Sequence, residues 1–332
     1  MNLIDNYNRK HDYLRISLTD KCNFNCIYCN PKNHMFKDMQ KIYLLTFEEI
    51  ERIVKLFAGK LGFRKVRFTG GEPLVRKDVF NLFEQISHIQ KDYGLKLGIT
   101  TNGSLVENKT DLLKKYGFHN LNISLDTLDR VKFEKITGKN DLEKVMRVIN
   151  EAEKNGFNPV KVNVVVIKGI NNDEILDFIN LFKNRNINIR FIEFMPFGSN
   201  DWQRNGFISY KEMKKLVERK VKLIPVVNEK NAVAKDFQIA GHLGKVSFIT
   251  SISEHFCSTC NRVRISSDGK FRVCLFSQGE SYVNFKEMFR AGFTDDMIIS
   301  KLNDAIKTKW GKHPDPEELA NAVNNNMMAI GG

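Results

Sequence analysis

The stretch Leu14-Arg-Ile-Ser-Leu-Thr-Asp-Lys-Cys-Asn-Phe-Asn-Cys-Ile-Tyr-Cys-Asn-Pro31 decides the fold of this chain. A short strand-like run leads into a loop with cysteines at C-x3-C-x2-C spacing: Cys22, Cys26 and Cys29. A [4Fe–4S] cluster is usually bound by four cysteine thiolates. Three thiolates on one loop can bind three of its irons, and the fourth iron then stays open for another ligand. Structural zinc is the alternative, and its fourth ligand could be His34 or Asp20.

Length and composition predict a soluble globular protein of roughly two domains. The chain has 332 residues, 42% hydrophobic and 27% charged, with a formal net charge of +13. The charge permits anionic partners such as nucleic acid, a triphosphate or an acidic protein. No apolar run approaches the length of a membrane span, and residues 1–10 lack the apolar core of a secretory signal. We therefore expect a cytoplasmic protein that binds no membrane.

The six cysteines fall into two triplets, of which the second is Cys257, Cys260 and Cys274. Disulfides are rare in the cytosol, so this clustering favours metal ligation. The second triplet has C-x2-C-x13-C spacing and again leaves a coordination position open. Zinc with His255 as the fourth ligand is the alternative at this site.

Strand-like segments alternate with helical ones through the first two thirds of the chain. The segments lie at 14–18, 65–69, 95–100, 121–125, 160–166 and 187–194, and Thr46-Phe-Glu-Glu49 is a capping box that begins the first long helix. Six such βα units predict a parallel sheet, either open or a partial barrel, whose ligands bind at the carboxyl ends of the strands. Short strands and helices follow residue 200.

Polar motifs follow the ends of these strands. Gly70-Gly-Glu-Pro73 follows the second strand, where glycines without Cβ atoms let a ligand approach the backbone. In the second cysteine region, Arg262 and Arg264 alternate with Val263, so a strand would place both guanidinium groups on one face. Two arginine forks beside a metal site suit a polyphosphate.

The first cysteine motif, with Tyr28 before its last cysteine, resembles the signature of the radical SAM superfamily, and Gly70-Gly-Glu-Pro73 matches the glycine motif of that family. The full set of motifs resembles the GTP 3′,8-cyclase family of molybdenum cofactor biosynthesis. The matching runs are 14–20, 22–29, 67–74, 100–103, 122–126, 161–163, 190–196, 257–274 and the terminal Gly331-Gly332.

This resemblance implies an α/β fold, an incomplete (βα)6 TIM-like barrel with a smaller α+β C-terminal domain. It places the radical SAM core at 5–222, and the second cluster and the GTP site at 223–332. Two [4Fe–4S] clusters are implied, one on each cysteine triplet, with S-adenosylmethionine (SAM) on the first and the guanine of GTP on the second. The implied reaction forms 3′,8-cyclo-7,8-dihydro-GTP after a 5′-deoxyadenosyl radical removes the C3′ hydrogen.

The resemblance also assigns individual residues. The implied SAM contacts are Tyr28, Gly71, Ser124 and Met195. The implied GTP contacts are Arg15, Arg67, Thr100, Lys161, Arg262, Val263 and Arg264. The implied catalytic residues are Cys22, Cys26, Cys29, Arg262, Arg264, Gly331 and Gly332, with the last two on a tail that reaches into the site.

The implied partners are a flavodoxin- or ferredoxin-like electron donor, the downstream cyclic pyranopterin monophosphate synthase and a second copy of the chain. Nucleic acid is not expected. One alternative is another radical SAM enzyme with an auxiliary C-terminal cluster. The other is a zinc-stabilised nucleic-acid-binding module, although no nucleic-acid-binding motif accompanies the basic charge.

Overall fold

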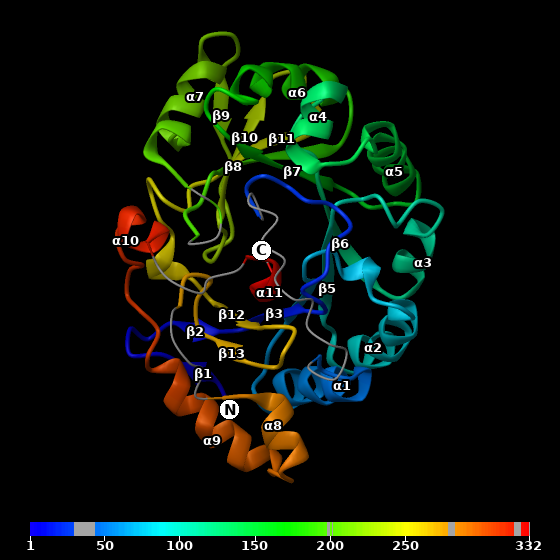
Figure 1. The fold of residues 1–332 in the computed structure, drawn as a ribbon, viewed down its shortest axis with the longest axis vertical. Helices are drawn as coiled ribbons and strands as arrows, with labels where there is room; N and C mark the ends of the chain where they lie inside the picture. The colour runs from blue at the N-terminus through cyan, green and yellow to red at the C-terminus, as the bar shows by residue number, and fades with distance from the viewer. Residues whose placement is uncertain (30–43, 198–199, 201, 278–282, 322–326, 332) are drawn as a thin grey trace.

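The computed structural model describes residues 1–29, 44–197, 200, 202–277, 283–321 and 327–331. Its centre is a curved sheet of six parallel strands, each joined to the next through helical segments (Figure 1). The strands are β3 (Tyr13–Ser17), β4 (Lys65–Thr69), β5 (Lys96–Thr101), β6 (Phe118–Ser124), β7 (Val160–Val166) and β8 (Ile187–Glu193). The predicted incomplete (βα)6 barrel is confirmed.

Helices cover the outer face of this sheet in Figure 1. They are α1 (Phe47–Lys55), α2 (Val79–Tyr93), α3 (Thr110–Lys115), α4 (Arg130–Thr137), α5 (Leu142–Lys154) and α6 (Ile175–Phe182). The predicted capping box is present at α1, where the Glu49 amide donates to Thr46 Oγ1 over 3.2 Å and the Thr46 amide donates to Glu49 Oε2 over 2.8 Å. None of the described helices is long and apolar enough for a membrane crossing.

Side chains alternate along the strands between an apolar outer face and a polar inner face. In β7, Val160, Val162 and Val164 are buried in the core, whereas Lys161 and Asn163 lie on the opposite face. A nearly continuous run of valines is typical of a parallel strand buried on both faces, but one face of β7 is polar. The inner face is polar because this barrel encloses a cavity instead of a packed apolar core.

The C-terminal part of the chain adds strands to both edges of the parallel sheet. After α7 (Tyr210–Glu218) come β9 (Leu223–Pro225), β10 (Ala234–Ile239) and β11 (Lys245–Ile249), and β11 pairs parallel with β8. The next strand, β12 (Arg262–Ile265), pairs parallel with β3 at the other edge. The connection 250–261 therefore bridges the open side of the barrel, and it carries Cys257 and Cys260.

Short elements complete the fold at the two ends of the chain. The N-terminal hairpin consists of β1 (Leu3–Ile4) and β2 (Lys10–His11). After β12 come β13 (Phe271–Arg272), α8 (Phe285–Arg290), α9 (Asp295–Ile306), α10 (Pro316–Ala320) and α11 (Met327–Ile330). In Figure 1, α11 lies inside the ring of strands.

Glu193, at the end of β8, ties the bridging connection to the barrel. Its carboxylate is fully buried and accepts hydrogen bonds from the backbone amides of Tyr210 (2.8 Å), Ile252 (2.8 Å) and Ser253 (2.9 Å). A buried carboxylate that satisfies three amides stabilises both segments, because each amide would otherwise lie unpaired away from water.

We predict that Glu193→Gln lowers the free energy of unfolding by at least about 2 kcal/mol, since an amide NH₂ would face backbone donors. Thermal unfolding of the apoprotein, followed by circular dichroism, should show a melting temperature several degrees lower. The matched control is Glu218→Gln, which removes an exposed ion pair with Lys214 worth about 0.3–0.5 kcal/mol. Equal melting temperatures for the two variants would contradict the role of Glu193.

Candidate active site

Both cysteine triplets line one cavity inside the barrel. The cavity has a volume of about 250 Å³. It is lined by all six cysteines and by Arg15, Tyr28, Gly71, Thr100, Ser124, Met195, Arg262 and Arg264 among the residues proposed from the sequence. Segments more than 200 residues apart in the sequence thus meet at one site.

The first triplet lies on the loop after β3, and its thiols are free and half-buried. The Phe24 backbone amide donates to Cys22 Sγ over 3.4 Å, and the side-chain nitrogen Nδ2 of Asn102 lies 3.9 Å from the same sulfur. Burial raises the pKa of Cys22 to about 11, and it also raises the pKa values of Cys26 and Cys29. Metal ligation would deprotonate such thiols, and N–H donors aimed at sulfur suit the resulting thiolates.

The part of the chain that the structure describes offers no site for a single metal ion such as zinc. There, no group of three His, Cys, Asp or Glu side chains converges closely enough to hold one metal ion. In an iron–sulfur cluster each thiolate binds a different iron, so the three sulfurs need not converge on one point. Of the two residues proposed as fourth zinc ligands of the first triplet, His34 lies outside the described residues.

The Gly70-Gly-Glu-Pro73 loop packs directly against the cysteine loop. The Gly71 amide donates to the Thr19 carbonyl over 2.8 Å, and a Cβ atom at Gly71 would lie 2.3 Å from the Lys21 carbonyl oxygen. Glu72 is buried and accepts hydrogen bonds from the Leu74 and Asn102 amides and from the Thr101 hydroxyl. Glu72 therefore orders the loop.

Tyr28 and Met195 are held by neighbouring polar side chains. The Tyr28 hydroxyl donates to Asp126 Oδ2 over 2.7 Å, and burial raises the pKa of Asp126 to about 6. The Asn200 side chain donates to the carbonyls of Tyr28 (3.1 Å) and Met195 (2.9 Å). Ser124, at the end of β6, lines the same wall of the cavity as Asp126.

The second triplet lies among cations. The Lys309 ammonium lies 3.6 Å from Cys260 Sγ, and Arg262 is also hydrogen-bonded to Cys260. Burial by itself would raise the pKa of Cys260, but Arg262 and Lys309 lower it to about 6. The backbone amide of His313 donates to the sulfur of Cys257. These donors fit thiolate ligands of a cluster in the same way as those of the first triplet.

Six cationic side chains extend from the inner faces of the strands. They are Arg15 on β3, Arg67 on β4, Lys161 on β7, Arg190 on β8, and Arg262 and Arg264 on β12. The parallel registers place Arg264 beside Arg15, and Arg15 beside Arg67. Gly98 on β5 leaves room for this row, because a Cβ atom there would lie 2.7 Å from Arg67 Nη2.

These cations raise one another's energy in the absence of an anion. Burial, and then Arg190 and Arg67, lower the pKa of Lys161 to about 8. Burial, followed by Arg67, lowers the pKa of Arg190 to about 10. Such mutual repulsion at a buried site is the electrostatic mark of a polyanion-binding pocket.

Several buried polar atoms on the inner face lack a hydrogen-bond partner among the described residues: Asn122 Oδ1, Asn163 Oδ1 and Arg262 Nε. All three residues line the cavity. Because buried polar atoms are nearly always paired, these atoms indicate a ligand with both donors and acceptors.

The remaining residues proposed from the sequence lie around this cavity. Arg67 is held by the Tyr13 hydroxyl (2.7 Å) and the Ile99 carbonyl (2.8 Å), and Lys161 donates to Asn120 Oδ1 over 2.9 Å. The Val263 side chain is fully buried in the apolar core, so only its backbone can face a ligand.

The C-terminal tail enters the barrel. The Gly331 carbonyl accepts a hydrogen bond from Arg264 Nη1. A Cβ atom at Gly331 would lie 2.1 Å from Thr69 Oγ1, so only glycine fits there. Gly332 lies outside the described residues.

Known proteins match the chain along almost its entire length. A model of the radical SAM superfamily matches residues 16–182, and a model named Molybdenum Cofactor Synthesis C matches residues 187–315. A GTP 3′,8-cyclase of Alkaliphilus oremlandii is 43% identical over 99% of each chain. A mitochondrial GTP 3′,8-cyclase of Arabidopsis thaliana is 44% identical and covers 99% of this chain and 83% of that protein.

The chain belongs to the radical SAM superfamily and, within it, to the GTP 3′,8-cyclase family. It spans about half the length of some curated relatives, such as molybdenum cofactor biosynthesis protein 1 of Dictyostelium discoideum, which is 45% identical over 99% of this chain and 52% of its own length. Membership of the superfamily implies a [4Fe–4S] cluster and SAM.

Solved structures confirm the radical SAM fold. Streptococcus suis SuiB bound to S-adenosylmethionine has a TM-score of 0.58 at 15% identity, covering 91% of this chain and 69% of that one. A second structure, anSMEcpe with bound AdoMet, has a TM-score of 0.57 at 16% identity, covering 89% and 81% of the two chains.

Sequence reasoning missed two residues that line this radical SAM cavity, Arg190 and Asn163, and two that lie near its lining residues, Tyr13 and Lys309. Arg190 and Asn163 lie on inward faces, which the alternation within β7 and β8 could have revealed. Tyr13 lies among the arginines. Desolvation by itself would raise the pKa of its phenol, but Arg67 and Arg15 lower that pKa to about 7. No local pattern indicates Lys309, which comes from the far end of the chain.

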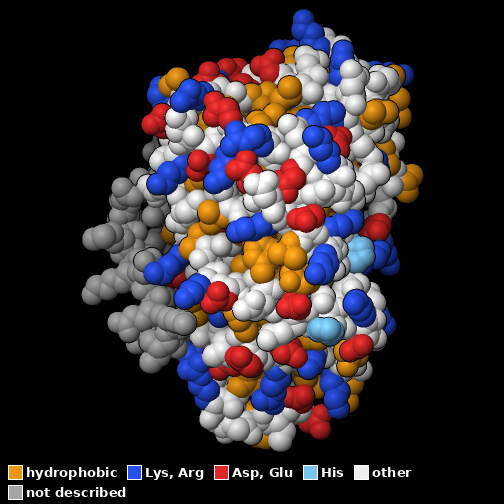
Figure 2. Space-filling model, turned by 90° about the vertical axis from the view of Figure 1, so that its right-hand side faces the viewer, with side chains coloured by type: hydrophobic (Ala, Val, Ile, Leu, Met, Phe, Trp, Pro, Cys, Tyr) orange, Lys and Arg blue, Asp and Glu red, His pale blue; other side chains and the backbone are white. Residues whose placement is uncertain are grey.

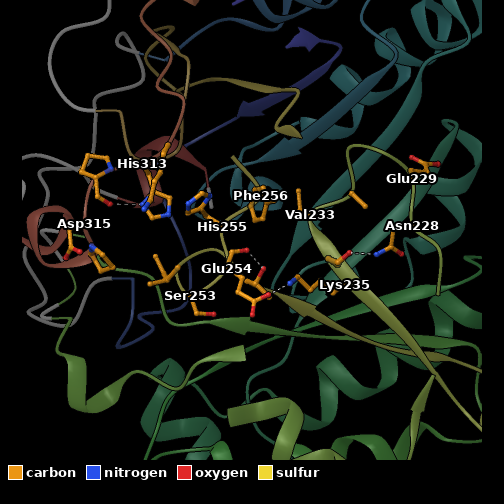
Figure 3. A pocket seen from close by; sticks show the side chains of 17 residues that line it. Asn228, Glu229, Val233, Lys235, Ser253, Glu254, His255, Phe256, His313 and Asp315 are labelled. Atoms are coloured by element: carbon orange, nitrogen blue, oxygen red, sulfur yellow. Dashed lines mark hydrogen bonds and ion pairs between the residues drawn. The ribbon is translucent and has the colours of Figure 1, made fainter. Parts of the chain in front are cut away.

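A more open cavity of about 830 Å³ adjoins the first and shares His255, Phe256 and His313 with it. Figure 3 shows His255 and His313 side by side, and their ring centroids are 5.3 Å apart. Lys235 and Glu254, which also line this cavity, form an ion pair. The surface in Figure 2 carries interspersed positive and negative side chains. By contrast, the six cationic side chains on the inner strand faces of this radical SAM chain all carry charge of one sign.

We predict that the cavity of this family member binds a nucleoside triphosphate such as GTP, and that this binding weakens as the pH rises above about 8. The pKa of Lys161 is about 8 in the ligand-free site, and a nearby phosphate would raise it, so binding takes up a proton above that pH. Titration calorimetry at pH 9 in buffers of different ionisation enthalpy should detect this uptake.

Lys161→Met should lose the proton uptake and weaken GTP binding about tenfold or more at pH 7. Lys215→Met, which removes an exposed lysine from α7, is the matched control. Unchanged proton uptake in Lys161→Met would show that another group titrates.

Proposed function

We propose that this chain converts GTP to (8S)-3′,8-cyclo-7,8-dihydroguanosine 5′-triphosphate, the first step of molybdenum cofactor biosynthesis. The observation that carries the proposal is a single cavity lined by both cysteine triplets and by four arginines, Arg15, Arg190, Arg262 and Arg264. Arg67 and Lys161 extend from the inner faces of the neighbouring strands. The names of the relatives from Alkaliphilus and Arabidopsis support the same activity.

The first triplet and the loops beside it would hold the cluster and SAM. Cys22, Cys26 and Cys29 would supply the thiolates. At Gly71 the backbone itself lines the cavity, because glycine has no side chain. Tyr28, Ser124 and Met195 line the same cavity. The Tyr28–Asp126 hydrogen bond would keep the aromatic ring in place for the bound cofactor.

The second triplet and the cationic strands would hold GTP. We propose that Cys257, Cys260 and Cys274 would hold a second [4Fe–4S] cluster, and that this cluster would bind the guanine. Arg15, Arg67, Lys161, Arg262 and Arg264 would clamp the triphosphate, with Thr100 and the Val263 backbone beside them. The buried site excludes water and fixes the substrate, which can supply a large part of the lowering of the barrier.

When bound, the first cluster and SAM would supply the 5′-deoxyadenosyl radical for removal of the C3′ hydrogen of GTP. C3′ would then bond to C8, and one electron, which derives from the electron donor, and one proton would complete the 7,8-dihydro product. The chain contributes orientation to this chemistry. The arginine row holds the phosphate end, while the second triplet holds the base end, so the ribose between them would face the SAM side of the cavity.

We further propose the remaining partners and the domain division. A flavodoxin- or ferredoxin-like protein would donate electrons, the downstream cyclic pyranopterin monophosphate synthase would take the product, and the chain would form a homodimer in the cytoplasm. The radical SAM core would comprise residues 5–222, and the segment 223–332 would carry the second cluster and the GTP site.

The test is anaerobic incubation of reconstituted protein with SAM, dithionite and GTP. We expect 5′-deoxyadenosine to form in step with GTP loss, both followed by chromatography, and Arg264→Ala to reduce GTP turnover at least 100-fold through loss of positioning. The exposed Arg219→Ala is the control. SAM cleavage that is indifferent to GTP would leave another radical SAM reaction, and zinc without iron in the protein would favour a zinc-stabilised module.

We predict that deletion of Gly331 and Gly332 abolishes cyclisation and leaves both clusters assembled. The deletion removes Gly331, whose carbonyl accepts a hydrogen bond from Arg264 and whose Cα packs against Thr69. It removes no cysteine. Iron and sulfide content and the cluster absorption should match those of the full chain. Full cyclase activity in the shortened protein would exclude a role for the tail.

A further inference from the structure

The turn that carries Cys257 and Cys260 is held from outside the cavity by two buried cations. Arg9, on the N-terminal hairpin, donates to the Cys257 carbonyl and to the Trp310 carbonyl, each over 2.6 Å. Its Nε donates to Asp5 Oδ2 over 2.6 Å, so the charge of Arg9 is paired. Arg9 thus fixes the backbone of the turn and does not reach its sulfurs in these contacts.

Lys309 makes a different kind of contact. Its side chain is only 4% exposed, and its ammonium donates to the Arg262 carbonyl over 2.6 Å. The same nitrogen lies 3.6 Å from Cys260 Sγ, within range of an N–H···S hydrogen bond. Burying an ammonium group is costly unless it is paired, so a permanent anionic partner is expected beside it.

The surroundings of the two cysteine triplets have opposite charge. The carboxylates that interact electrostatically with the first triplet are Glu72, with Cys22, and Asp126, with Cys26. The second triplet has Lys309 and Arg262 beside Cys260. Hydrogen bonds to the sulfurs and nearby charge are among the factors that set the reduction potential of an iron–sulfur cluster.

We propose that Lys309 is a positioning residue of the second cluster, which donates a hydrogen bond to the Cys260 thiolate and raises the reduction potential of that cluster. This inference rests on the proposed second cluster. Reduction adds one negative charge to the cluster, and a buried ammonium beside a ligand sulfur stabilises that charge. Lys309 also holds the Arg262 carbonyl, which couples the cysteine turn to the start of β12.

The experiment isolates the second cluster in the full-length chain. Cys22, Cys26 and Cys29 are replaced by Ala, the protein is reconstituted anaerobically, and iron and sulfide are measured. A dithionite titration followed by electron paramagnetic resonance then gives the midpoint potential. Lys309→Met removes both the charge and the N–H donors. Lys309→Gln removes the charge but keeps a neutral N–H donor, so the contact that helps the region fold can persist. Lys309→Arg keeps the charge.

We expect Lys309→Met to lower the potential most, Lys309→Gln to lower it less, and Lys309→Arg to stay near the unaltered protein. The matched control is Lys307→Met, which removes an exposed lysine two residues away whose nearest ion pair is with Asp304 at 3.8 Å. Its potential should not change, so a general effect of net charge is separated from the contact.

Potentials in Lys309→Met and Lys309→Gln that equal that of the unaltered protein would overturn the role of Lys309 and leave the proposed second cluster intact. The absence of iron and sulfide from the triple-alanine protein with Lys309 unchanged would instead overturn the second cluster itself. A lowered potential in the lysine variants with full iron content would support both.

Discussion

The parallel pairing of β12 with β3 is the constraint on which the rest of the site depends. It joins residues about 250 positions apart in the sequence and sets Arg264 directly beside Arg15. The same pairing carries the connection 250–261 across the open side of the barrel, so that Cys257 and Cys260 face the cavity already lined by Cys22. The site would not exist in the six-stranded core alone.

The cationic side chains inside the barrel repel one another, and this repulsion raises the electrostatic energy of the folded state. Burial lowers the pKa values of Arg15, Lys161, Arg190 and Arg264, and the neighbouring cations lower them further. The fold tolerates this because the outer face of the same strands is apolar and packs on the helices. A polyanion would relieve the repulsion, so the site is arranged for binding at the expense of stability.

Much of this protein could be predicted from local sequence patterns. The strands at 65–69 and 160–166 and the capping box of α1 have the predicted bounds, because side-chain periodicity and capping chemistry act over a few residues. Motif resemblance predicted the cysteine triplets and the radical SAM family. The inner polar face of β7 was missed, since a run of valines is also typical of a strand buried on both sides.

By itself, the sequence determined the order of strands and helices, the cysteine spacing and the basic composition, because these depend on residues that are near one another in the chain. Only the tertiary structure decided that Arg190 and Asn163 face the cavity, that Tyr13 lies among arginines, and that Lys309 contacts Cys260. Those facts depend on strand register and on burial summed over distant segments. A cation row forms only when parallel registers align side chains from strands far apart in the sequence.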